Sequence, residues 1–80
     1  MELPMLDFLR EQNPYTGNEG DFRYKLQPEG ETLRVWAYQT WCLEYCREHG
    51  LMLGEAEFPL DAGGLEQAAG WLGERAREMN

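Results

Sequence analysis

Three residues of types that bind metals or act as nucleophiles lie close together in the stretch WAYQTWCLEYCREHG. They are Cys42, Cys46 and His49, which include both cysteines and the only histidine of the chain. Structural zinc sites use four ligands in matched pairs, and the second pair is missing here. The C-x3-C spacing also differs from the C-x-x-C of dithiol redox proteins. A metal- or thiol-dependent protein remains an alternative, but we expect reduced thiols in ordinary packing, with no metal and no cofactor.

The residue types argue against common catalytic arrangements. The chain contains no serine, which excludes serine-based triads. A Cys–His dyad can be drawn from Cys42 or Cys46 with His49, but no residue is evident that would orient the histidine. The paired carboxylates Glu55 and Glu57 are more often solvated charges in an acidic chain. We therefore predict a protein that is not an enzyme.

Length and charge narrow the kind of partner. A chain of 80 residues is expected to form one domain, residues 1–80. Fifteen acidic against seven basic residues give a net charge of −8. Phosphate binding needs a basic surface, so we expect no direct binding of nucleic acid. The charge fits a protein partner with a basic surface, mimicry of a nucleic-acid backbone, or solubility alone.

The sequence shows no feature of secreted or membrane proteins. The N-terminal stretch MELPMLDFLREQN lacks the basic region and apolar run of a signal peptide. No stretch approaches the roughly 18 apolar residues that a membrane span needs. Two cysteines are too few for a disulfide framework. We expect a soluble, cytoplasmic protein.

Hydrophobic patterning predicts the elements of an α+β fold. Residues 2–12 read as a short amphipathic helix and residues 13–21, rich in turn formers, as a loop that is the softest part of the chain. Residues 22–38 alternate in two runs around a turn at Gly30, which indicates a β-hairpin. Its first face carries Phe22, Tyr24, Leu26, Leu33, Val35 and Ala37, and its second face carries Arg23, Lys25, Arg34, Trp36 and Tyr38.

The second half of the chain holds one ambiguous segment. Residues 40–50 fit either a helix, with Thr40 as N-cap and Gly50 after its end, or a strand, which their aromatic content slightly favours. Residues 55–60 read as a strand, and residues 62–79 as a helix capped by Asp61. We expect Gly70 and Gly73 of this helix to allow close approach of another element. The prediction is an antiparallel β-meander of three to four strands, flanked by an N-terminal and a C-terminal helix packed on one face of the sheet.

The aromatic residues suggest how a partner is bound. Trp36 and Tyr38 share the second sheet face with arginines, and Trp71 lies off the apolar stripe of the last helix. Trp, Tyr and Arg anchor protein interfaces, so we predict a partner-binding set of Trp71, Trp36, Tyr38, Arg75, Glu74 and Glu78. Two alternatives remain open: the rings are covered by the N-terminal helix or by residues 40–50, or they join two copies of the chain in a homodimer.

Three motifs support a resemblance to known sequences. NPYTG (residues 13–17), FRYK (residues 22–25) and FPLD (residues 58–61), followed by Leu65 and Trp71-Leu72, resemble short uncharacterised α+β proteins of anaerobic gut bacteria and their mobile elements. The resemblance implies no known activity. It implies a bacterial, mobile-element setting in which small acidic proteins often inhibit host defence enzymes. The concrete expectation is an inhibitor of a nucleic-acid-handling defence enzyme, similar to an anti-CRISPR protein.

Overall fold

A four-stranded antiparallel sheet forms the centre of the fold. The computed structural model describes residues 2–39, 43–50 and 52–79. The elements along the chain are α1 (Leu6–Arg10), β1 (Tyr15–Glu19), β2 (Phe22–Glu29), β3 (Thr32–Gln39), α2 (Leu43–His49), β4 (Met52–Pro59) and α3 (Ala62–Met79). The strand order is β1-β2-β3-β4. The predicted α+β meander between an N-terminal and a C-terminal helix is therefore confirmed.

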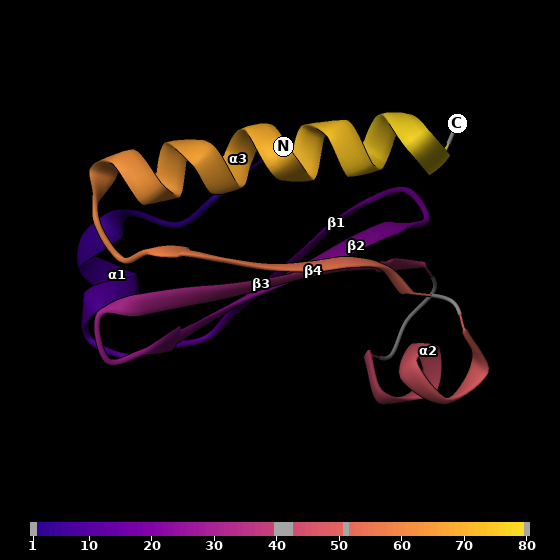
Figure 1. Cartoon of the computed structure of the whole chain (residues 1–80), viewed down its shortest axis with the longest axis horizontal. Helices are drawn as coiled ribbons and strands as arrows, with labels where there is room; N and C mark the ends of the chain where they lie inside the picture. The colour runs from indigo at the N-terminus through magenta and orange to yellow at the C-terminus, as the bar shows by residue number, and fades with distance from the viewer. Residues whose placement is uncertain (1, 40–42, 51, 80) are drawn as a thin grey trace.

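The main core lies between the sheet and α3 (Figure 1). The first face of the predicted hairpin is buried as expected, with Leu26, Leu33 and Val35 fully shielded from solvent. Ala68 and Leu72 of α3 pack against this face, and Leu9 of α1 closes the core at one end. The alternation of apolar and polar residues thus identifies the correct inner face. No helix in the described part of the chain is long and apolar enough to span a membrane.

A second, smaller core lies on the opposite face of the sheet. Trp36 and Tyr38 are only 6% and 5% exposed because α2 packs against them. Their contacts in this cluster are Cys46, Leu43 and Met52. Helix α2 therefore covers part of the sheet face that lies opposite α3.

Residues 43–49 are helical, so the slight preference for a strand over residues 40–50 is wrong there. Leu43 and Cys46 both pack on the second core, and a spacing of three residues puts them on one side of a helix but on opposite sides of a strand. Gly50 follows the helix with φ +69°, as the helical alternative required. The N-cap predicted at Thr40 lies outside the described residues.

The first 21 residues differ most from prediction. The N-terminal helix is shorter than the predicted residues 2–12. Helix α1 covers only Leu6–Arg10, and Pro4 lies before its start. Gln12 then takes φ +66°, and its side-chain amide bonds both the N–H (3.0 Å) and the carbonyl (3.1 Å) of Gly30 in the β2–β3 turn.

The loop predicted at residues 13–21 instead contains strand β1. Its central residue, Gly17, pairs with Tyr24 of β2. A Cβ atom on Gly17 would lie 2.4 Å from the Tyr24 ring, so the ring occupies the space of the missing side chain. The turn-forming composition concealed this strand because glycine is normally unfavourable within one.

Helix α3 begins as predicted, and a glycine fixes its start. The Gly64 N–H donates to the Asp61 carboxylate at 2.7 Å, which confirms Asp61 as the cap. A Cβ atom on Gly64 would lie 1.7 Å from the Pro59 carbonyl oxygen. By contrast, no atom lies within 4 Å of a Cβ built on Gly70 or Gly73. The expected close approach at those two glycines is therefore wrong, and it occurs at Gly64 instead.

Gly64→Ala is expected to lower the free energy of unfolding by about 3 kcal/mol, since the methyl group collides with rigid backbone. The matched control is Gly70→Ala, which should raise it by up to about 1 kcal/mol because the site is open and alanine favours helix. Urea denaturation of both variants measures the difference. Equal changes in the free energy of unfolding for the two variants would contradict the close contact of Gly64 with Pro59.

Candidate functional site

The cysteine–histidine group of the sequence does not form one site in the described residues. Cys46 is fully buried, and its Sγ contacts the carbonyl oxygen of Gln39. His49 is exposed, stacks on the ring of Tyr45 at 4.0 Å between centroids, and places Nδ1 2.9 Å from the Tyr45 carbonyl oxygen. Cys42 lies outside the described residues. Among those described, no group of three His, Cys, Asp or Glu residues could hold a metal ion.

Four of the six predicted partner-binding residues come together on α3. Trp71 is half-buried, and the guanidinium of Arg75 lies over its ring at 5.6 Å. Arg75 also pairs with Glu78 at 2.8 Å and approaches Glu74 at 3.9 Å. The Trp71 ring packs edge-on against Phe58 of β4 and covers Gly54. These contacts give Trp71 a structural role, while Glu74 and Glu78 face solvent.

Trp36 and Tyr38 lie on the opposite side of the sheet from this group. Their burial under α2 excludes the rings as exposed anchors in this structure, as one of the open alternatives expected. Trp36 is instead the centre of a stack of cations. Arg34 and Arg47 lie over its ring at 5.3 and 5.5 Å, and Lys25 lies at 6.0 Å.

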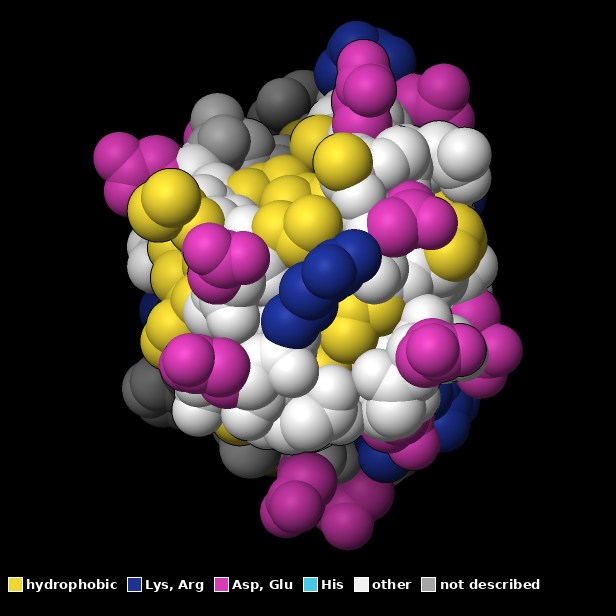
Figure 2. All heavy atoms as spheres, turned by 90° about the vertical axis from the view of Figure 1, so that its left-hand side faces the viewer, with side chains coloured by type: hydrophobic (Ala, Val, Ile, Leu, Met, Phe, Trp, Pro, Cys, Tyr) yellow, Lys and Arg dark blue, Asp and Glu magenta, His cyan; other side chains and the backbone are white. Residues whose placement is uncertain are grey.

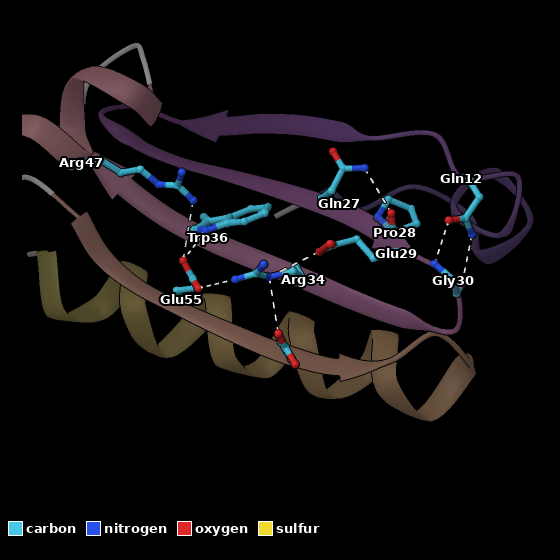
Figure 3. Close-up of polar contacts among 10 residues, drawn as sticks. Gln12, Gln27, Pro28, Glu29, Gly30, Arg34, Trp36, Arg47 and Glu55 are labelled. Carbon is cyan, nitrogen blue, oxygen red and sulfur yellow. Dashed lines mark hydrogen bonds and ion pairs between the residues drawn. The ribbon is translucent and has the colours of Figure 1, made fainter.

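A carboxylate holds this stack in place (Figure 3). Glu55 accepts a hydrogen bond from the Trp36 indole N–H and a second from Arg34 at 2.6 Å. These bonds, first from Trp36 and then from Arg34, lower the pKa of Glu55. Arg34 also contacts Glu29 and Glu57 at 3.5 Å, and its bond to Glu55 raises its own pKa. Arg34 thus joins carboxylates from β2 and β4, and this network stabilises the sheet.

Among the described residues, two of the three large exposed apolar side chains lie elsewhere, at the N-terminal end of the fold. Met5 is 77% exposed and Phe8 is 41% exposed. Together with Pro4, Asp7 and Tyr15 they line a shallow apolar hollow of about 360 Å³, here named the N-terminal hollow. Figure 2 shows hydrophobic side chains on this end of the molecule, with a Lys or Arg side chain lying across them and acidic side chains around them.

A second hollow adjoins the first and follows strand β1. It is lined by Glu2, by all five residues of β1 (15–19) and by Tyr24, and its volume is about 320 Å³. We name it the β1 groove. Tyr15 borders both hollows, so an apolar surface continues into a more polar one along the strand.

Tyr24 forms the floor of the β1 groove. Its hydroxyl donates a hydrogen bond to the carbonyl oxygen of Glu2, which ties the N-terminal segment to the sheet. Burial raises the pKa of Tyr24 to about 12, and the charges of Tyr15, Glu19 and Glu2 add to the effect. The carboxylates of Glu2 and Glu19 line the groove, so it is acidic along its length and apolar where it meets the N-terminal hollow.

Met5 and Phe8 are not among the site residues predicted from the sequence. They read as neighbours of the apolar face of a helix over residues 2–12. In the shorter helix α1, Leu9 takes the buried position and Met5 precedes the first turn, so Met5 and Phe8 remain outside the core. The short spacing of apolar residues in LPMLDFL, more than one helix face can bury, is the only signal that the sequence offered.

Glu55→Gln is expected to reduce the loss of stability in acid. A lowered pKa in the folded chain means that the carboxylate stabilises the fold above its ordinary pKa, and that this contribution is lost as the pH falls through the lowered value. The variant should be less stable than wild type at pH 7, and its free energy of unfolding should fall less than that of wild type when the pH is lowered. Urea denaturation at pH 7, 5 and 3 measures this, with the more exposed Glu57→Gln as control. Parallel pH profiles of wild type and Glu55→Gln would contradict the assignment.

Tyr24→Phe is expected to change the alkaline unfolding. The folded chain holds the Tyr24 proton up to about pH 12, whereas the ordinary value is 10.0, so this contribution is complete below pH 10 and is lost between pH 10 and 12. Its size is on the order of 2 kcal/mol. Denaturation at pH 9 and 11.5 should show a smaller loss for Tyr24→Phe than for wild type. The control is Tyr45→Phe, since Tyr45 is exposed. Its loss of stability between pH 9 and pH 11.5 should equal that of wild type.

Comparison of the chain with family models, with curated proteins and with solved structures gives no match. The residues that could meet a partner are therefore identified by their exposure, charge and contacts.

Proposed function

We propose that the chain is a non-enzymatic protein-binding module and that it docks through the N-terminal hollow. The observation that carries the proposal is the exposure of Met5 and Phe8 around a hollow lined almost entirely by apolar atoms. Apolar side chains grouped at one place, with a polar rim, are typical of protein interaction sites. Burying a methionine or phenylalanine side chain contributes about 1.5–3 kcal/mol, so two such residues supply a substantial part of a binding free energy.

The charge indicates the chemistry of the partner. The net charge is −8, and Glu2, Asp7 and Glu19 lie at the hollow and the adjoining groove. A basic surface is attracted to such a site within a Debye length of about 8 Å, which accelerates association more than it tightens the complex. Glu74 and Glu78, which face solvent on α3, remain proposed secondary contacts with the same partner.

Nucleic-acid-handling enzymes are a class of protein with basic surfaces, because their own ligands are polyanions. We therefore propose, as the concrete form of this function, that the chain inhibits such an enzyme in the manner of an anti-CRISPR protein. The acidic charge and the resemblance to mobile-element proteins support this form. The binding proposal itself rests on the hollow alone.

A homodimer is the second candidate, since a second copy could cover the same apolar hollow. The exposed Met5 and Phe8 favour it as much as they favour a foreign partner. The charge opposes it, because joining two copies brings together two chains of −8 each. Sedimentation velocity of the protein alone separates the two candidates, and we expect a monomer.

The double variant Met5→Ala/Phe8→Ala is expected to weaken partner binding by 10-fold or more while leaving the fold intact, because both side chains are exposed. Affinity capture from cells of the organism that encodes the chain identifies the partner, and biosensor kinetics measure the affinity. Tyr45→Ala is the matched control, since Tyr45 is 44% exposed but lies on α2. A double variant that binds the captured partner as tightly as wild type would contradict the docking site.

A further inference from the structure

The two edges of the sheet differ in how well they are protected. At one edge, β4 contains Pro59, its Glu55 and Glu57 are paired with Arg34, and Trp71 of α3 covers its Gly54. Proline and charged side chains are common devices that prevent pairing at a sheet edge. At the other edge, β1 pairs with β2 alone in the described part of the chain and contains neither proline nor lysine. β1 is therefore the edge at which a further strand could add.

The hollows next to β1 have the shape that an added strand requires. The β1 groove follows the strand over its whole length, Tyr15 to Glu19, which corresponds to about 16 Å of extended chain. The N-terminal hollow continues from Tyr15. A segment paired with β1 would place every second side chain on the side of these hollows.

We infer that β1 binds an extended segment of the partner protein by strand addition, with a large apolar side chain of that segment in the N-terminal hollow and a lysine or arginine beside the β1 groove. This inference rests on the proposed function and names the part of the partner that the site takes. Main-chain hydrogen bonds to β1 supply affinity, and the two hollows supply side-chain selectivity, as in other strand-addition complexes.

The electrostatics select a basic segment. Glu2 and Glu19 line the groove, and Asp7 at the hollow makes no ion pair within the described residues. The raised pKa of Tyr24 has the charges of Glu19 and Glu2 among its causes, which is consistent with negative potential along this edge. A lysine or arginine two residues from the apolar anchor would lie on the same side of the added strand.

The same features disfavour a second copy as occupant. Antiparallel pairing of two β1 strands about Gly17 would put the Tyr15 of each copy opposite the Glu19 of the other. It would also place the acidic residues Glu2 and Glu19 of both copies along one edge, in addition to the general repulsion of two chains of −8. A foreign, basic segment is attracted to this acidic edge, whereas a second copy is repelled by it.

The first experiment uses a display library of random decapeptides selected on the wild-type protein. We expect the selected peptides to share a large apolar residue and a lysine or arginine two positions away. A synthetic peptide of the dominant sequence should bind Met5→Ala/Phe8→Ala at least 10-fold more weakly than wild type, and Tyr45→Ala as tightly as wild type. Selection of no peptide, or of peptides with equal affinity for the double variant, overturns the inference.

The second experiment tests strand pairing without changing the protein. In an antiparallel or parallel pair, only every second N–H of the added strand points toward its neighbour. N-methylation of the synthetic peptide at one alternate set of residues should therefore weaken binding at least 10-fold, while methylation of the other set should change it little. Hydrogen exchange of the complex should show new protection of amides within residues 15–19. Equal effects of both methylated sets, or protection elsewhere, overturns the inference.

The results separate this inference from the proposed function. If the captured natural partner depends on Met5 and Phe8 but N-methylation shows no alternation, the chain binds proteins at the hollow without strand addition. If the partner does not depend on Met5 and Phe8, the proposed docking site fails as well. A wild-type dimer in sedimentation, with β1 amides protected in the absence of peptide, identifies a second copy as the occupant and overturns the choice of a foreign segment.

Discussion

The pairing of β2 with β3 is the constraint on which the rest of the molecule depends. Eight residue pairs, from Phe22–Gln39 to Glu29–Thr32, fix the register of these strands. Side chains alternate along a strand, so a slip of one residue would exchange the two faces of the sheet. In the native register Leu33 and Val35 face α3, while Arg34 and Trp36 face α2 and the carboxylates of β4. One pairing therefore determines both cores and the ionic network.

The parts of the fold that could be predicted are those with a regular pattern. The alternation in FRYKL and TLRVWAY identified the hairpin and its inner face, and Asp61 identified the start of α3. The helix at residues 43–49 could not be predicted in the same way, because a segment of only seven residues fits both the helix and the strand period. Whether this segment forms a helix or a strand depends on Trp36 and Tyr38 of β3, which lie outside the segment and are covered by Leu43 and Cys46. Strand β1 was missed for a related reason, since Gly17 is compatible with a strand only because the Tyr24 ring fills its place.

The candidate site was less predictable than the fold. Tryptophan, tyrosine and arginine mark interfaces only when they are exposed, and exposure is a property of the packed chain. In this protein Trp36 and Trp71 are used for packing, each with an arginine over its ring. A domain of 80 residues buries only a modest share of its surface. Large rings such as those of Trp36 and Trp71 therefore contribute much of the packing that is available to it. Among the described residues, the large apolar side chains left exposed are those of Met5, Phe8 and Tyr45.

The placement of charge relates the packing to the proposed binding. On the sheet face that carries Trp36, the acids Glu29, Glu55 and Glu57 all contact Arg34, which partly compensates their charges within the molecule. On the β1 side, Asp7 makes no ion pair within the described residues, and Glu2 and Glu19 line the groove beside the Tyr24 hydroxyl, whose pKa their charges help to raise. Acidic charge thus lies at the sheet edge where β1 pairs with β2 alone in the described residues, and beside exposed apolar side chains. A basic, extended segment with one apolar anchor would satisfy all three features together, whereas a ligand that lacked any one of them would leave either a charge, a strand edge or an apolar surface exposed to water.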